Sequence, residues 1–390
     1  MKAFFTLVLS LIIGIIHAQK FDDLAKTPPM GWNSWNKFGC DINEKIIREM
    51  ADAMVSTGLK DAGYDYLVID DCWQIRRDDN GTIVADPERF PSGMKSLGDY
   101  IHSKGLKFGI YSDAGTATCQ GRPGSRGYEF QDARTYAAWG VDYLKYDWCN
   151  HGKQNSEASY TTMRDALFKA GRPVVFSICE WGTTKPWEWA RDIGHLSRST
   201  EDIINCFDCK NYWGGMGVTG IIDLFADLYK YAGPGHWNDA DMLEIGNGVL
   251  IPAEERLHLS MWAMFASPLM AGNDIRSVSK ETVSILTNKE VIAIDQDPLG
   301  VAALRWMQYG DLEIWFRPLE GGNYAFCFIN RGSQPVTLDQ DLKTTVRKYA
   351  IDANFMVRDL WKHQEIGTTA ENVKGILLPH DVLMVKLTKK

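Results

Sequence analysis

The sequence predicts an α/β protein, a (β/α)8 barrel followed by a C-terminal antiparallel β-sandwich. From about residue 27 to residue 294, short apolar runs alternate with helical stretches, and eight of these runs resemble strands. This alternation is typical of a parallel sheet covered by helices. After residue 300 the apolar residues recur with a period of two between turn residues, which indicates antiparallel strands.

The 390 residues suffice for one large and one smaller domain. Residues 1–18 are typical of a signal peptide, because Lys2 precedes an apolar run that ends at the small Ala18. We therefore expect a signal peptide (1–18), a catalytic barrel (19–300) and a β-sandwich domain (301–390). A signal peptide predicts an exported protein, secreted or periplasmic, and the run is short for a membrane anchor.

The composition narrows the classes of partner. The formal net charge is −8 and no basic run is present, which argues against nucleic acid and anionic membranes. Aromatic residues make up 12% of the chain, with 14 tryptophans. Such a composition suits sugar binding, but on composition alone a large aromatic core is the favoured explanation.

The expected strands and helices follow each other along the chain. The strand-like runs are MGWNSW (30–35), YDYLVIDDCW (64–73), LKFGIYSDAG (106–115), VDYLKYDWCN (141–150), PVVFSICEW (173–181), HLSRSTEDI (195–203), GHWNDADML (235–243) and PLMAGNDI (268–275). Helices are expected near 44–58, 94–105, 129–140, 157–170, 186–194, 221–231 and 280–286. Asp41 and Glu44 are the expected capping pair of the first helix.

Polar residues gather where these runs end, at the edge that carries the active site of such barrels. Seven of the eight runs end in carboxylates, often beside tryptophan. Crowded carboxylates repel one another and raise each other's pKa values, so stability does not explain them. We expect Asp113 and Asp274 to orient loops, and His236 is the one histidine considered near this rim.

The stretch LKYDWCN (144–150) carries the sharpest signal. On a strand, Tyr143, Lys145 and Asp147 point to one side. Lys145 and Asp147 are either a buried ion pair or a nucleophile kept ionised by its neighbour. We expect the lysine to lower the pKa of Asp147.

Two chemistries fit a carboxylate-rich rim. A metal-dependent hydrolase would need ligands such as Asp239 and Asp241, but no H-E-x-x-H motif is present and Lys145 would compete with the metal. Glycoside hydrolysis by two carboxyls fits better, because charged groups bind sugar hydroxyls strongly. We predict no metal and no cofactor.

The motifs MGWNSW, YLVIDDCW, GIYSDAG, LKYDWC, CEWG, R-x-x-x-D and HWNDADML resemble, in the same order, those of the α-galactosidases of glycoside hydrolase family 27. The resemblance extends from about residue 27 to the C-terminus. It implies a barrel with a C-terminal β-domain. It also implies a retaining exo-glycosidase that releases terminal α-D-galactose from galacto-oligosaccharides, galactosides or galactomannan branches through a covalent intermediate.

The resemblance also implies roles for individual residues. Asp147 matches the nucleophile and Asp202 the acid/base. Asp70 and Asp71 match the pair that holds galactose at O4 and O6. The further matched sugar contacts are Lys145, Glu180, Arg198 and Asp241, and the matched pocket walls are Trp35, Tyr111 and Trp181. Because Arg198 should help Asp202 ionise, which is unfavourable for an acid, we infer that Arg198 points mainly to the sugar.

Alternatives remain within and outside this family. A β-L-arabinopyranosidase is disfavoured by the intact Asp70-Asp71 pair. An α-N-acetylgalactosaminidase is disfavoured mainly by Glu180. A non-catalytic galactose-binding barrel and a metal-dependent hydrolase are the alternatives from other classes. The expected partner is a galactoside, with an oligomer possible.

The cysteines and tryptophans give further expectations. The resemblance implies the disulfides Cys40–Cys72 and Cys119–Cys149, and it leaves Cys179 unpaired because Gly194 occupies the matching position. Cys206 and Cys209 form a C-x-x-C for which a local disulfide is the first interpretation, and Cys327 is expected as a buried thiol. Among four tryptophans without a matched role, Trp213, Trp262 and Trp306 are expected in the core or an interface, and Trp237 near the rim.

Overall fold

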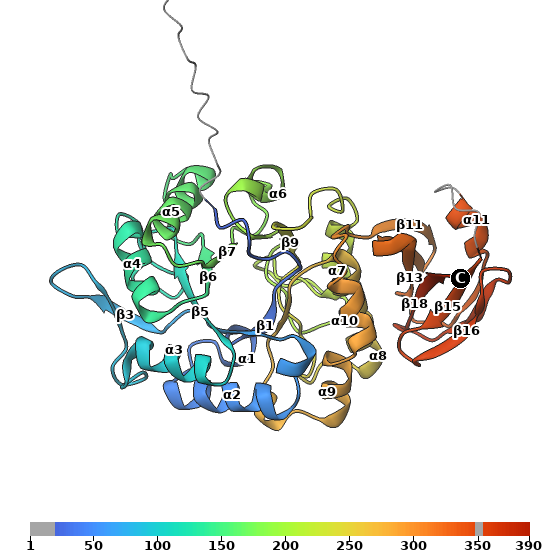
Figure 1. Cartoon of the computed structure of the whole chain (residues 1–390), viewed down its shortest axis with the longest axis horizontal. Coiled ribbons are helices and arrows are strands. Elements are labelled where there is room, and N and C mark those ends of the chain that lie inside the picture. Colours follow the sequence, from blue (N-terminus) through green and yellow to red (C-terminus); the bar gives the residue numbers. More distant parts are fainter. Residues whose placement is uncertain (1–19, 348–353) are drawn as a thin grey trace, which may run out of the picture.

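The computed structural model describes residues 20–347 and 354–390, drawn in colour in Figure 1. The predicted signal peptide lies outside these residues. In the described part of the chain, no helix is both long and apolar enough to cross a membrane.

The larger part of the molecule is built on a sheet of eight parallel strands in the order β10-β1-β2-β5-β6-β7-β8-β9. The strands are β1 (Met30–Asn33), β2 (Tyr66–Ile69), β5 (Lys107–Asp113), β6 (Tyr143–Asp147), β7 (Val175–Ile178), β8 (Leu196–Arg198), β9 (Trp237–Asp239) and β10 (Leu269–Ala271). Leu243, just after β9, bridges to Ala271 and donates its N–H to the Met270 carbonyl at 2.7 Å. This contact joins the two ends of the sheet, and the predicted barrel is confirmed.

Helices surround the sheet (Figure 1). They are α1 (Trp35–Phe38), α2 (Glu44–Ser56), α3 (Gly93–Ser103), α4 (Glu129–Trp139), α5 (Ser156–Ala170), α6 (Pro186–Trp189), α7 (Val218–Phe225), α8 (Pro252–Phe265), α9 (Lys280–Leu286) and α10 (Lys289–Asp295). The 3-10 turns are η1 (Lys60–Ala62), η2 (Ala190–Asp192) and η3 (Ile275–Ser277). A hairpin of β3 (Gln74–Arg77) and β4 (Ile83–Ala85) after β2 was not expected.

Two helix predictions need correction. The side chain that caps α2 belongs to Asn43, which accepts the N–H of Ile46 at 3.0 Å, so the predicted Asp41–Glu44 pair is wrong. Asn43 directly precedes the first helical residue, the position from which a side chain reaches the free N–H groups. The helix expected at 221–231 is α7, which begins at Val218 and already ends at Phe225.

The alternation of side chains along the barrel strands separates two cores. Residues such as Tyr66, Val68 and Tyr143 pack with Trp237 inside the barrel. Their neighbours, such as Leu67, pack outward beneath the helices. Because the period is two, the residues that continue the inward series beyond the apolar layer are the polar ones. This register aims them into the mouth of the barrel.

The C-terminal part is an antiparallel β-domain beside the barrel (Figure 1). Its strands are β11 (Leu304–Tyr309), β12 (Leu312–Leu319), β13 (Asn323–Asn330), β14 (Val336–Gln340), β15 (Phe355–Asp359), β16 (Gln364–Thr368), β17 (Val373–Leu377) and β18 (Val382–Lys389), with η4 (Glu320–Gly322) and α11 (Leu342–Arg347) between strands. Six strands form the sheet β11-β12-β13-β18-β15-β16, and β14 pairs with β17 in a second, smaller sheet. The predicted β-sandwich is confirmed, although β11 and β16 were not expected as separate strands.

The two faces of the large β-domain sheet have different partners. Phe316, Phe326 and Val385 pack with Leu338 of the small sheet. Trp315, Cys327 and Met384 face the other way and join the core that contains the barrel helices. Alternate side chains of the same strands therefore form the core of the sandwich and its contact with the barrel.

Candidate active site

A cavity of about 650 Å³ opens at the C-terminal ends of the barrel strands. Ten of the eleven residues singled out from the sequence line it: Trp35, Asp70, Asp71, Tyr111, Lys145, Asp147, Trp181, Arg198, Asp202 and Asp241. Glu180 does not line the cavity. It is fully buried, and its Oε2 accepts the N–H of Thr184 at 2.8 Å and the hydroxyl of Thr184 at 2.7 Å.

Lys145 contacts a different carboxylate from the one expected. Its Nζ lies 2.9 Å from Oδ2 of Asp70, which follows β2, two strands away from β6 in the sheet. Asn33 donates to the same oxygen at 2.7 Å. The lysine therefore pairs with Asp70, and it acts on Asp147 only through its charge.

Asp147 is buried and held by two hydrogen bonds. Its Oδ2 accepts the Tyr111 hydroxyl at 2.9 Å, and its Oδ1 accepts the N–H of Trp148 at 2.9 Å. Burial raises the pKa of Asp147 to about 6, against the opposing effect of the Lys145 charge. Lys145 lowers this pKa, as expected, but desolvation outweighs the lysine and the net shift is upward.

Asp113 is the register partner of Asp147 on the adjacent strand. Burial, followed by the charge of Asp147, raises the pKa of Asp113 to about 8. Its carboxylate accepts the N–H groups of Gly115 at 2.6 Å and Cys149 at 2.9 Å. Asp113 thus holds two loops beside the end of β6.

Arg198 bridges two carboxylates from different segments. Its Nη2 lies 2.8 Å from Oδ1 of Asp202 and 3.0 Å from Oδ2 of Asp241. Burial raises the pKa of Asp202, but the charges of Arg198 and Lys145 and the hydrogen bond from Arg198 together outweigh burial, and the net shift is downward. The inference that Arg198 points mainly to the sugar needs correction, because in the empty cavity its guanidinium binds both acids.

The backbone is strained at three strand ends around the cavity. Cys72, Trp181 and Asp241 have φ values of 79°, 57° and 72°. Left-handed φ costs a non-glycine residue about 1–3 kcal/mol, and such residues concentrate at functional sites. Asp71, next to Cys72, is fixed as well, because its oxygens accept the N–H groups of Cys72 and Gln120 at 2.7 and 3.0 Å.

Disulfides tie the loops at this edge. Cys40 pairs with Cys72, Cys119 with Cys149, and Cys206 with Cys209. Cys179 and Cys327 are free and buried.

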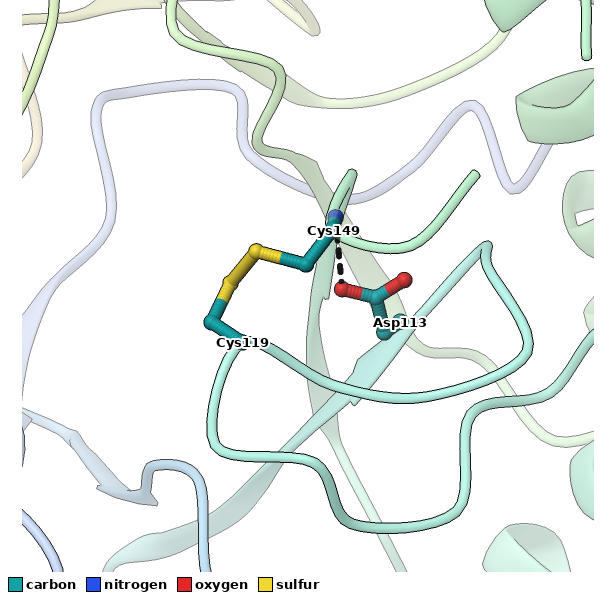
Figure 2. A group of neighbouring side chains, drawn as sticks. All are labelled: Asp113, Cys119 and Cys149. Carbon is teal, nitrogen blue, oxygen red and sulfur yellow. Dashed lines mark hydrogen bonds between the residues drawn. A yellow bond between two sulfur atoms is a disulfide. The ribbon is translucent and has the colours of Figure 1, made fainter. Parts of the chain in front are cut away.

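Figure 2 shows Asp113 beside the sulfurs of Cys119 and Cys149, a grouping that resembles a set of metal ligands. The two sulfurs are bonded to each other, and the Asp113 carboxylate accepts the N–H of Cys149. These atoms are therefore engaged with one another and do not form a metal centre.

Two tryptophan predictions are wrong. Trp237 is fully buried inside the barrel and donates to the Ala25 carbonyl at 2.8 Å, so it is a core residue. Trp213 is 49% exposed and lines the cavity. Trp262 is buried, as expected, and Trp306 packs against the β-domain core.

His236 and Asp274 do not join the site. His236 is buried, its Nδ1 lies 2.8 Å from the Gly194 carbonyl, and burial lowers its pKa to about 3. Asp274 pairs with Arg276 at 2.8 Å. Cavity residues that sequence reasoning missed include Asn36 in the short helix α1 and Asn205, Glu244 and Asn247 on loops, where no strand pattern marks them.

Comparisons with known proteins agree with this geometry. A sequence profile described as "Alpha galactosidase A" matches residues 27–297, and one described as "Alpha galactosidase C-terminal beta sandwich domain" matches residues 309–387. "Alpha-galactosidase A" of Cellvibrio japonicus is 54% identical, over 98% of this chain and 98% of its own.

Solved structures of similar proteins superimpose on this chain. The crystal structure of α-galactosidase I from Mortierella vinacea superimposes with a TM-score of 0.91 at 39% identity, covering 94% of this chain and 98% of that one. A β-L-arabinopyranosidase from Geobacillus stearothermophilus superimposes with a TM-score of 0.82 at 26% identity, covering 93% of this chain and 97% of that one.

Proposed function

The chain belongs to the alpha galactosidase A family, and from this premise we propose that it is a retaining exo-α-galactosidase. Its substrates carry terminal, non-reducing α-D-galactose, as in galacto-oligosaccharides, galactosides or galactomannan branches. The observation that carries the proposal is the meeting of Asp147 and Asp202 in one cavity with Lys145 and Arg198. A retaining glycosidase needs two carboxyl groups, one as the nucleophile and one as the acid/base.

The reaction proceeds in two steps. Asp147 attacks the anomeric carbon, the glycosidic C–O bond breaks, and Asp202 gives its proton to the departing oxygen. A water then attacks the galactosyl–Asp147 ester, Asp202 takes the proton of this water, and galactose leaves with its α configuration. The hydrogen bonds of Asp147 to Tyr111 and Trp148 aim the nucleophile throughout.

The single proton shared by Asp147 and Asp202 must lie on Asp202 before Asp147 attacks the sugar. In the empty cavity Asp147 has the raised pKa and Asp202 the lowered one, so a single proton favours Asp147. The reactive form carries the same proton on Asp202 and has the same net charge. The Asp202 side chain is 41% exposed in the empty cavity, and a bound sugar that removes its water favours its protonated form.

Galactose is the proposed sugar because the Asp70-Asp71 pair is intact and fixed. Lys145 and Asn33 hold Asp70, and backbone N–H groups hold Asp71. We assign these two acids to O4 and O6 of galactose. The other proposed contacts are Lys145, Arg198 and Asp241 for hydroxyls and Trp35, Tyr111 and Trp181 as walls, whereas Glu180 acts through the turn that positions Trp181.

The proposed domain plan keeps the signal peptide at 1–18, the catalytic barrel at 19–300 and the β-sandwich domain at 301–390. Export is supported by the three disulfides, because such bonds persist in oxidising compartments. The disulfides Cys40–Cys72 and Cys119–Cys149 also brace the loops that bear Asp71 and Asp147.

One experiment tests both sugar choice and stereochemistry. Aryl α-galactoside, aryl α-N-acetylgalactosaminide and aryl β-L-arabinopyranoside are compared at equal concentration, and the first-formed anomer is followed by NMR. We expect the α-galactoside to react fastest and α-galactose to appear first. First release of β-galactose, or faster reaction of either competitor, would overturn the proposal. Loss of turnover in EDTA, restored by one divalent ion, would instead favour a metal-dependent hydrolase.

A further inference from the structure

Trp213 is an exposed aromatic residue that the two-carboxylate mechanism does not use. Its indole is 49% exposed and lines the cavity that contains Asp147 and Asp202. Large apolar side chains exposed in a polar cavity are typical of binding surfaces. A cavity of about 650 Å³ lies in the usual range for drug-sized ligands, which are larger than one sugar ring.

The loop that carries Trp213 is rigidly built. The Cys206–Cys209 disulfide closes its base, and the N–H of Gly217 donates to the Cys209 carbonyl at 2.8 Å. The N–H of Asn211 donates to the Gly215 carbonyl at 2.9 Å, which makes a tight turn around the tryptophan. A loop held in this way presents its side chain without a large entropy cost on binding.

Gly215 fixes the orientation of the indole. A Cβ at this position would lie only 2.3 Å from Cη2 of Trp213, so the ring lies directly against the glycine backbone. Any larger residue would displace the ring. The glycine therefore holds one edge of the indole in place while the rest remains open to the cavity.

The same loop is hydrogen-bonded to the backbone of Asp202, the proposed acid. The N–H of Met216 donates to the Asp202 carbonyl at 3.0 Å, and Ile203 forms a bridge with Met216. Because Asp202 protonates the departing oxygen, the leaving group must lie on its side of the cavity. Trp213 is thus attached to the wall that faces the leaving group.

Two amide oxygens on this wall lack hydrogen-bond donors within the described residues. Asn205 and Asn247 line the cavity, and Asn205 donates to the Asn247 carbonyl at 3.1 Å. Their Oδ1 atoms are buried and accept no hydrogen bond within the described part of the chain. Unpaired acceptors of this kind are costly, and a donor from a bound ligand would remove that cost.

We propose that Trp213, with Asn205 and Asn247, forms a subsite for the first sugar of the leaving group. The indole stacks on the carbon face of a neutral hexose, and the amides bind its hydroxyls. The enzyme is therefore built for galactose joined to another sugar, rather than for galactosides of small alcohols. This inference rests on the proposed α-galactosidase activity.

The test compares two substrates that differ only in the leaving group. α-Galactosyl fluoride fills no leaving-group subsite, whereas a galactosyl-α-1,6-hexose disaccharide fills it with a sugar. We expect Trp213→Ala to lower the ratio of kcat/KM for the disaccharide to kcat/KM for the fluoride by roughly tenfold. Trp213→Phe should restore part of the ratio, and Gly215→Ala should lower it by displacing the ring.

The matched control is Tyr212→Ala. Tyr212 adjoins Trp213 on the same loop and is 99% exposed, but it does not line the cavity. The ratio of kcat/KM for the disaccharide to kcat/KM for the fluoride should be the same in Tyr212→Ala as in the wild type. If Trp213→Ala and the wild type have equal kcat/KM ratios, and thermal unfolding curves show that both proteins are folded, the subsite proposal is overturned. Failure of the wild-type protein to hydrolyse the fluoride would instead refute the α-galactosidase proposal, so the two failures are distinguishable.

Discussion

The active-site cavity and the barrel–sandwich interface both bury charged groups, but they balance charge differently. Around the cavity, buried carboxylates outnumber the cations: Asp70, Asp71, Asp113, Asp147, Asp239 and Asp241 face Lys145 and Arg198. In one group at the interface, the two acids Asp223 and Glu313 meet the two cations Arg305 and Arg331. Arg331 lies 2.7 Å from both Glu313 of the β-domain and Asp223 of the barrel.

The consequences for pKa values follow this difference. Burial raises the pKa of Asp147 and of Asp239 to about 6, and that of Asp113 to about 8. At the interface, in contrast, Arg331 and Arg305 lower the pKa of Asp223 against the opposing effect of its burial. Unbalanced acids cost stability, so their retention in the cavity points to chemistry, whereas matched pairs serve docking.

The largest expected effect comes from removing one cavity carboxylate. Asp147→Asn should lower kcat by about 10⁴-fold or more, because the amide is a poor nucleophile. It should leave the fold intact, since the change removes a buried charge rather than a partner. Kinetics on an aryl α-galactoside, with galactose binding by calorimetry as the control, provide the check. Hydrolysis at the wild-type rate would exclude Asp147 as the nucleophile.

Breaking the interface should affect stability instead of chemistry. Arg317 of β12 is fully buried and donates to the carbonyls of Ala263 and Asp295 on the barrel. Arg317→Met removes both donated hydrogen bonds and the positive charge near the buried Asp295, so we expect a loss of about 3 kcal/mol in unfolding free energy. Urea denaturation measures it, with kcat at 25 °C unchanged. A loss below about 1 kcal/mol would show that this arginine does not hold the domains together.

The pH profile tests the charge balance of the cavity directly. Catalysis needs one proton on the Asp147–Asp202 pair. Above about pH 6 the pair loses this proton, because the raised pKa of Asp147 is the higher of the two. We expect kcat/KM to be greatest below pH 6 and to fall about tenfold per unit above it. A plateau that extends to pH 8 would contradict the assigned order of pKa values.

The smallest effect is expected where the interface has a spare cation. Arg331→Gln leaves Arg305 within 3.0 Å of Asp223 and 3.3 Å of Glu313. We therefore expect a loss of only about 1 kcal/mol in unfolding free energy. The double variant Arg305→Gln/Arg331→Gln should lose more than the sum of the single variants, because Glu313 is then buried without a cation. If the double variant loses only the sum of the two single-variant losses in unfolding free energy, neither arginine compensates for the absence of the other.

The sequence predicted the barrel strands because each combines a buried apolar run with a polar end. The inward series Tyr143, Lys145 and Asp147 follows from strand periodicity alone. The sequence could not predict which oppositely charged side chain each charged residue would contact. Lys145 binds Asp70, which lies beyond the intervening strand β5, and Arg198 bridges to Asp241 across segments distant in sequence.

The tryptophans show the limit more clearly. Trp237 precedes an acidic motif but continues the inward apolar series, which buries it. Trp213 lies in a glycine-rich loop without periodicity, and its exposure depends on a disulfide and on Gly215. Loop paths of this kind are set by long-range contacts, so the leaving-group wall was missed while the strand ends were found.

The central claim is that Asp147 forms a covalent bond with galactose. Incubation with 5-fluoro-α-galactosyl fluoride, which slows breakdown of the intermediate, should yield a protein heavier by one fluorogalactosyl group. Peptide mass spectrometry should place this group on Asp147, and Asp147→Asn should acquire none. A group located on Asp113 or Asp202, or turnover without any covalent species and with β-galactose as first product, would contradict the account.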